Sequence, residues 1–157
     1  MRIRNMIILA LLIGVVMVFL LSGCEMCTPH EPIEPNVFRN VMEAEGYEVR
    51  DIMAEQEMAP AFLHFLVVVT DNYRFEFAEF TEEEYAIDIF TSMKAAIEDM
   101  RGVTRTYRRI NLANYSIFEQ TSAGNFSYLY RVENTILRVS ADVEYTMHAR
   151  GIIDRIR

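Results

Sequence analysis

The amino-acid sequence predicts an α+β fold, in which an antiparallel β-sheet carries helices packed on one of its faces. Two observations lead to this class. Segments in which apolar and polar residues alternate come in pairs joined by short turn sequences, which is typical of hairpin-linked strands. Three other segments repeat apolar residues at i and i+4, the spacing of an amphipathic helix. Because runs of strands lie between the helices, we expect the order helix, three strands, helix, three strands, helix.

The first half of the domain is expected to begin with a helix and to continue into a hairpin. Asn36 can cap this helix, and Gly46 can adopt the positive φ that commonly ends one. Asp71 and Asn72 supply the tight turn of the hairpin, since both residue types tolerate turn conformations. The strands expected here are residues 47–52, 62–69 and 73–80, of which the second is the most apolar and is expected to be central.

The second half of the domain is expected to begin with the longest helix. Thr81 and Glu84 have the spacing of a capping box, and Gly102 can end the helix that follows. An arginine-rich connection over residues 103–109 is expected next. Asp142 can cap a last helix. The strands expected between these elements are residues 111–120, 126–132 and 135–141.

The first 24 residues have the three parts of an export signal. Arg2 and Arg4 form a basic start, and residues 6–21 form an apolar run. The motif Leu21-Ser22-Gly23-Cys24 follows, with small residues before the cysteine. This motif resembles the lipobox of bacterial lipoproteins. The resemblance implies that the chain is cut before Cys24 and that the Cys24 thiol carries a diacylglycerol.

Two other interpretations of this segment remain open. Residues 6–22 reach the lower limit for a membrane-spanning helix, which is about 17 residues, so an uncleaved anchor is one alternative. Cys24 and Cys27 also form a C-x-x-C pattern, which is typical of thiol redox sites when it opens a helix. Here the pattern precedes a proline-rich stretch, and a lipidated Cys24 cannot form a disulfide, which disfavours redox chemistry.

Residues 25–35 are expected to form a tether. Pro29, Pro32 and Pro35 recur at every third position, which favours an extended, polyproline-like chain. At about 3.1 Å per residue, such a tether would hold the domain roughly 30 Å from the bilayer. The expected organisation is therefore a cleaved signal peptide over residues 1–23, a lipid-anchored tether over 24–35 and one α+β domain over 36–157.

The balance of charges excludes one class of partner. The chain carries 15 Lys and Arg residues against 23 Asp and Glu residues, with a net charge of −8. Binding to nucleic acid depends on neutralising phosphates with cationic side chains. We therefore expect no nucleic-acid partner.

The sequence carries no recognisable catalytic motif. It contains no glycine-rich phosphate loop, no H-E-x-x-H zinc motif and no G-x-S-x-G nucleophile motif. We therefore expect no catalytic residue, no cofactor and no metal site. His64 shares a strand face with apolar residues and is expected to be a core or partly buried histidine, with a catalytic or ligand role as the alternative. His148 on the last helix is expected to be solvated.

A group of arginines forms the first candidate binding site. Guanidinium groups offer forked donors that suit anionic oxygens, so this group could hold a lipid phosphate, a wall polymer or an acidic partner. The alternative is a solvated loop with ordinary surface arginines. The residues are Arg101, Arg105, Arg108 and Arg109, with Tyr107 among them.

Aromatic residues of the last strands form a second candidate site. Tyr128 and Tyr130 lie on one face of the strand expected over residues 126–132. If helices cover only one face of the sheet, some aromatic side chains lie on the open face, where they could bind a partner or a sugar. The alternative is that they belong to the core.

The domain also resembles small uncharacterised lipoproteins of Firmicutes-type bacteria. The resemblance rests on Gly46-Tyr47-x-Val49-x-Asp51, on Phe80 with Ala86 and Phe90, and on Asn134-Thr135 before a β-rich run. It implies no activity. Together these features predict a lipid-anchored, extracytoplasmic protein of the cell membrane that acts as a non-catalytic binding module. The alternatives are an accessory subunit of a membrane complex and a small-ligand sensor or enzyme.

Overall fold

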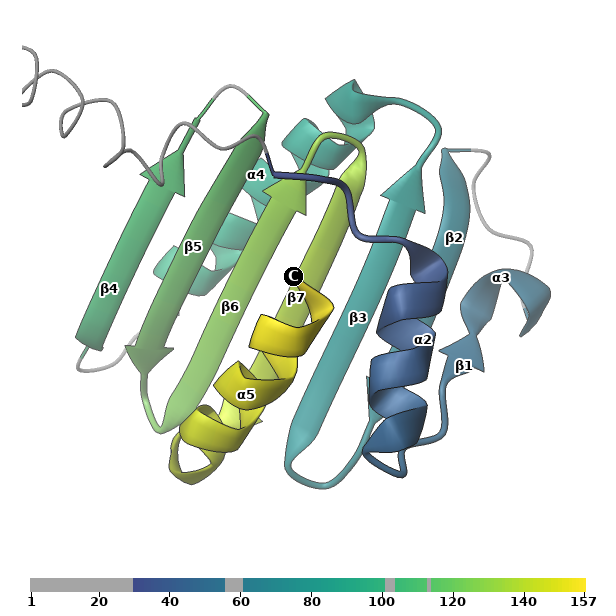
Figure 1. Ribbon diagram of the computed structural model, residues 1–157. Helices are drawn as coiled ribbons and strands as arrows, with labels where there is room; N and C mark the ends of the chain where they lie inside the picture. The colour runs from purple at the N-terminus through teal and green to yellow at the C-terminus, as the bar shows by residue number, and fades with distance from the viewer. Residues whose placement is uncertain (1–29, 56–60, 101–103, 113) are drawn as a thin grey trace, which may run out of the picture.

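The computed structural model of the chain describes residues 30–55, 61–100, 104–112 and 114–157 (Figure 1). These residues form an α+β fold around a seven-stranded antiparallel sheet, which confirms the predicted class. The strand order is β1-β2-β3-β7-β6-β5-β4, so β7 is central and the strand expected at the centre, β2, is second from an edge. The strands are β1 (Arg50–Asp51), β2 (Phe62–Val69), β3 (Tyr73–Phe80), β4 (Thr104–Asn111), β5 (Tyr115–Ser122), β6 (Asn125–Val132) and β7 (Thr135–Asp142).

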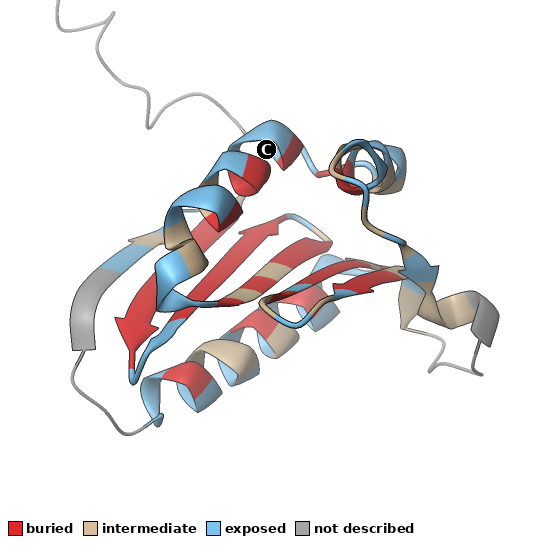
Figure 2. Ribbon diagram, turned by 90° about the horizontal axis from the view of Figure 1, so that it is seen from below, coloured by how far each residue is buried: buried red, intermediate tan, exposed pale blue. Residues whose placement is uncertain are grey.

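Helices lie on both faces of the sheet, and the prediction of helices on one face is wrong. The helix α4 (Glu83–Glu98) packs on one face of the sheet, and α2 (Pro35–Ala44) and α5 (Thr146–Ile156) pack on the other (Figure 2). The reason is that the strands around β7 carry apolar residues on both faces, so that neither face can be left to water. The helices are α2 (Pro35–Ala44), α3 (Ile52–Glu55), α4 (Glu83–Glu98), the 3-10 turn η2 (Val143–Tyr145) and α5 (Thr146–Ile156).

Each face of the sheet has its own core. The α5-side core lies beneath α2 and α5 and is rich in aromatic residues, among them Phe38, Phe75, Phe77, Phe126, Tyr128 and Tyr130. The α4-side core is smaller and consists of Ala78, Phe80, Ala86, Phe90, Ile97, Phe118, Leu129 and Ile136. Removal of these apolar side chains from water is the main stabilising term of the fold.

The arginine-rich segment after α4 is a strand rather than a connection. It forms β4, which pairs with β5 so that Arg109 lies opposite Phe118 and Asn111 opposite Ser116. The second half of the domain therefore has four strands instead of three. Its charged residues concealed the strand, because β4 is an edge of the sheet, and charged side chains are common on edge strands, where they deter pairing with another chain.

Local sequence signals placed some helix ends correctly and others wrongly. Gly46 has a φ of 83°, and the Tyr47 amide donates back into the last turn of α2 at 3.0 Å, as expected of a helix end closed by glycine. The helix itself begins at Pro35, a residue suited to the first helical position, and not after a cap at Asn36. Thr81 does not cap α4, because its hydroxyl donates instead to a carbonyl of the segment before β2.

The end of the expected tether packs on the domain. Ile33 is buried in the α5-side core, and the Nδ1 atom of His30 lies 2.6 Å from the hydroxyl of Tyr130. Asn114 donates a hydrogen bond of 3.2 Å to the backbone carbonyl of His30. The folded domain therefore includes residues 30–35. No helix among the described residues is long and apolar enough to cross a membrane.

Candidate anion-binding cleft

A cleft of about 330 Å³ opens between α4 and the strands β4, β5 and β6. Three cationic side chains line it, although the chain as a whole has a net charge of −8. These cations are Lys94, Arg109 and Arg131. The rest of the lining is Ile87, Phe90, Thr91, Ile110, Asn111, Leu112, Ser116 and Ile117.

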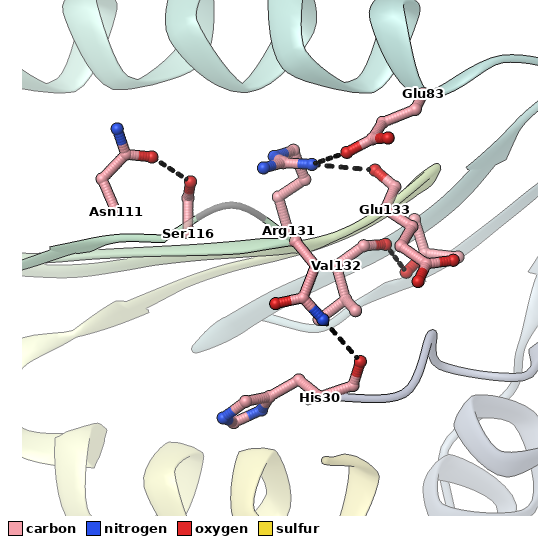
Figure 3. A network of polar contacts seen from close by, with 9 residues as sticks. His30, Glu83, Asn111, Ser116, Arg131, Val132 and Glu133 are labelled. Atoms are coloured by element: carbon pink, nitrogen blue, oxygen red, sulfur yellow. Dashed lines mark hydrogen bonds and ion pairs between the residues drawn. The ribbon is translucent and has the colours of Figure 1, made fainter. Parts of the chain in front are cut away.

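Arg131 is the most deeply buried of the three cations, with an exposed fraction of 4%. It lies on β6 and points toward α4, where its Nη1 atom donates to the Glu83 carboxylate at 2.8 Å and to the backbone carbonyl of Glu133 at 3.1 Å (Figure 3). Within the described residues, its Nε and Nη2 atoms have no hydrogen-bond partner. The Arg131 guanidinium thus has unpaired N–H donors beside an open cleft.

Lys94 and Arg109 approach the cleft from opposite walls. Lys94 lies on α4, where its Nζ atom is 3.2 Å from the Glu98 carboxylate and 5.9 Å from the centre of the Phe118 ring. Arg109 is exposed on β4, and its pairing with Phe118 places it on the α4 side of the sheet. The cleft therefore has one partly neutralised cation on its helix wall and one solvated cation on its strand wall.

Asn111 and Ser116 add neutral polar groups to the cleft. The Ser116 hydroxyl donates to the Asn111 side-chain oxygen at 2.6 Å, across the β4–β5 pair. This bond directs the Asn111 amide nitrogen, a donor, toward α4 (Figure 3). The cleft thus offers hydrogen-bond donors from β4, β6 and α4, and the chemistry of this donor set suits an anion.

The predicted arginine group is only partly brought together by the structure. Arg109 lines the cleft. Arg108 is opposite Glu119 in the β4–β5 register, and alternation along the strand puts it on the other face of the sheet. Arg101 lies outside the described residues. Arg105 and Tyr107 belong to β4, but their side chains are not among the described ones. Alternation along a strand therefore separates arginines that are neighbours in the sequence.

Tyr128 and Tyr130 are not on an open face, so the prediction of a binding surface there is wrong. Both are buried beneath α5, because α5 covers the face on which they lie. The Arg157 guanidinium donates to the Tyr128 hydroxyl at 3.1 Å and stacks over the Tyr130 ring at 4.9 Å. Burial raises the pKa of Tyr128 to about 12, so its hydroxyl stays protonated.

The histidines do not form a site. His64 is exposed near the start of β2 rather than buried in the core, and its Nε2 atom lies 3.9 Å from the Glu79 carboxylate. His148 is exposed, as expected, and its Nε2 atom lies 3.3 Å from the Glu45 carboxylate. In the part of the chain that the structure describes, no three His, Cys, Asp or Glu side chains are grouped to hold a metal. Cys24, the predicted site of lipidation, lies outside the described residues.

Sequence reasoning missed two of the cations that line the cleft. Lys94 belongs to a helix with an ordinary pattern, so nothing in its sequence context singles it out. Arg131 carried a detectable signal, because it alternates with buried aromatic residues on a strand and must face the other side of the sheet. Once helices cover both faces, such an arginine has to lie beneath a helix.

Comparison with known proteins assigns no family to the chain. No family model matches it, and no curated protein matches it. Among solved structures, it is similar to a GTP binding regulator from Thermotoga maritima, with 14% sequence identity and a TM-score of 0.47, over 82% of this chain and 90% of that chain. A likeness at this level does not bear on function.

Proposed function

We propose that this chain is a lipid-anchored, extracytoplasmic protein of the cell membrane whose domain is a non-catalytic binding module. The observation that carries the proposal is the convergence of Lys94, Arg109 and Arg131 on one cleft of an acidic domain. Arginine stays protonated at any physiological pH, so it binds anions through charge and forked hydrogen bonds but does not transfer protons. A site built from such groups is suited to holding a ligand.

The predicted anchor places this cleft near a membrane. Five residues lie between Cys24 and residue 30, the first that the structure describes, and an extended chain spans about 3.3–3.6 Å per residue step. A lipid on Cys24 would thus hold the domain within roughly 20 Å of the bilayer surface. Ligands present in the membrane or at its surface are then within reach of the cleft.

Metabolic labelling tests the anchor. Cells that express the full chain are grown with an alkyne-tagged fatty acid, and the tag is detected on the purified protein. We expect the wild-type protein to be labelled and to fractionate with membranes, and Cys24→Ser to lose the label. An intact mass that retains residues 1–23 and carries no lipid would overturn the anchor.

Photo-crosslinking in cells tests the binding site. A photoreactive amino acid is placed at Ile87, which is exposed at the rim of the cleft, and in a control protein at Met147, which is exposed on α5 at the other face. We expect a discrete adduct from position 87 and only background from position 147. Equal adduct patterns from both positions would remove the cleft from the proposal.

A further inference from the structure

We propose that the cleft beneath α4 binds an oxyanion, a phosphate or a carboxylate, that carries an apolar substituent. This inference rests on the proposed function, because it names the class of ligand that the same cleft takes. Three features of the described residues carry it: the unused donors of a buried arginine, the surplus of positive charge around them and the apolar rim.

The unused donors belong to Arg131. A guanidinium has five N–H donors, and those that bond in the structure come from Nη1 alone. The Nε and Nη2 atoms are not among the fully buried atoms that lack a partner, so both keep some access to solvent and to a ligand in the cleft. Glu83 and the Glu133 carbonyl occupy one side of the guanidinium, and Asn111 and Ser116 lie toward its other side (Figure 3). An oxyanion there would accept two parallel bonds from Nε and Nη2.

The surplus of positive charge comes from Lys94 and Arg109 on the two walls. Lys94 is paired with Glu98, but Arg109 is solvated and forms no ion pair among the described residues. Glu83, the carboxylate on Arg131, is 46% exposed on the side-chain scale and can turn to water. A ligand anion therefore meets one exposed cation at the entrance and one half-neutralised cation inside.

Another arginine pair on the same face lacks this surplus. Arg74 and Arg138 both contact the buried carboxylate of Glu76, at 2.7 and 3.0 Å. Their charges are shared with an anion that the fold already supplies. The cleft at Arg131 differs because its internal carboxylate occupies only one nitrogen of the guanidinium.

The apolar rim indicates that the anion carries a hydrocarbon group. Ile87 on α4 and Leu112 after β4 line the cleft and are 42% and 37% exposed, and the buried Phe90 lines it as well. Exposed apolar side chains beside a cationic floor match an amphiphile with one charged end. The volume of about 330 Å³ is at the small end for ligand sites, which suits a headgroup with a short apolar portion.

Calorimetric titration tests the ligand class. The full lipidated protein, in phosphatidylcholine nanodiscs, is titrated separately with hexyl phosphate, hexanoate, inorganic phosphate and hexanol. We expect hexyl phosphate to bind at least about tenfold more tightly than inorganic phosphate, through burial of part of its chain, and hexanol not to bind. Hexanol binding as tightly as hexyl phosphate, or no heat from any of the four compounds, would overturn the proposal.

Neighbouring arginines on β4 supply a matched control. Arg109→Met and Arg108→Met remove the same charge from adjacent positions, but only Arg109 lines the cleft. We expect Arg109→Met to weaken hexyl phosphate binding about threefold to tenfold and Arg108→Met to leave it unchanged. Equal effects of the two variants would show that only the overall charge matters and would contradict the site.

Two further variants test the paired N–H donors of the Arg131 guanidinium. Arg131→Lys replaces a forked donor by a point charge and is expected to weaken binding about tenfold or more, whereas Glu83→Gln removes a competing carboxylate and is expected to strengthen it. If Arg131→Lys does not fold, the exposed Arg109 still decides the test. Tighter binding by Arg131→Lys, or weaker binding by Glu83→Gln, would contradict the assigned geometry.

The source of the ligand is distinguished by the bilayer. Nanodiscs that contain phosphatidylglycerol would compete with hexyl phosphate if the cleft takes a lipid headgroup, and would leave its affinity unchanged if the ligand is soluble. Either result supports the ligand class. A cleft that fails every titration but still forms adducts from position 87 would overturn this inference and spare the proposed function.

Discussion

The two faces of the sheet are covered by helices to different extents and are filled with different side chains. The α5-side face is covered by two helices and is filled with aromatic rings, such as Phe77 against Phe38 at 5.7 Å between ring centres. The α4-side face is covered by one helix of 16 residues, which spans about 24 Å. This face also holds buried charged side chains, including Glu76 and Arg131.

A binding site on such a fold can form on the face that its helices cover less completely. Strands lie about 4.8 Å apart, so a sheet of seven strands is wider than one helix can cover. The main contacts of α4 with the sheet are with β3, β5, β6 and β7. Beside α4 the sheet therefore remains half-open, and polar side chains there meet both the core and water. The closed face provides stability, and the half-open face provides the cleft.

The largest expected effect tests the closed face. Phe77→Ala removes a fully buried ring from the α5-side core and is expected to lower the free energy of unfolding by about 3–5 kcal/mol. Ile87→Ala, at the rim of the cleft, is expected to change it by less than about 0.5 kcal/mol. Urea denaturation followed by circular dichroism measures both. Similar losses would break the comparison between the faces.

A smaller effect tests the ion pair of the half-open face. Glu83→Ala leaves the Arg131 guanidinium buried with fewer partners and is expected to lower the free energy of unfolding by about 1–3 kcal/mol. Arg131→Met removes the buried charge and leaves a half-exposed carboxylate that water can solvate, so its loss is expected to be smaller. If Arg131→Met proves the more damaging change in urea denaturation, Arg131 contributes to stability rather than being held ready for a ligand.

A change of pH tests the segment that crosses the closed face. Burial, followed by the charge of Arg157, holds the pKa of His30 below its usual value of 6.5, so packing favours the neutral ring. This contribution to stability is complete above pH 6.5 and is lost as the pH falls through 6.5 toward the lowered pKa. We expect the NMR methyl signals of Ile33 to move toward random-coil positions in this range. In His30→Gln, which does not titrate, they should stay constant.

The smallest expected effect concerns the helix wall of the cleft. Lys94→Met breaks the ion pair with Glu98 one turn along α4 and is expected to lower the free energy of unfolding by about 0.3–0.5 kcal/mol. Because salt screens partly exposed charges, the loss should shrink at 1 M sodium chloride. A loss that persists in salt would mean that the stem of Lys94, packed by Phe118, contributes more than its charge does.

The fold was largely predictable because its elements repeat simple periods. The hairpin of β2 and β3 and the apolar face of α5 follow from alternation and from the i, i+4 spacing of residues such as Ala149 and Ile153. Two features of the fold could not be predicted from the sequence. Periodicity shows that a strand has two faces but not which of them a helix covers, and the charged residues of β4 obscure its alternation.

The cleft was less predictable than the fold because its cations come from three separate elements. Arg109 was singled out with its sequence neighbours, but β4 turns Arg108 to the opposite face. Lys94 and Arg131 reach the cleft only through the packing of α4 on β5 and β6, which is a tertiary fact. Tyr128 and Tyr130 failed as site residues for the same reason, since α5 covers them.

The most direct test of the cleft is an NMR titration of arginine side chains. Hexyl phosphate is added to ¹⁵N-labelled protein in nanodiscs, and the Nε–Hε signals of Arg131 and Arg157 are followed. We expect the Arg131 signal to shift strongly and saturably as the oxyanion accepts its Nε–H, while the signal of Arg157, on the other face, stays in place. A shift at Arg157 with none at Arg131 would contradict the assignment of binding to the half-open face.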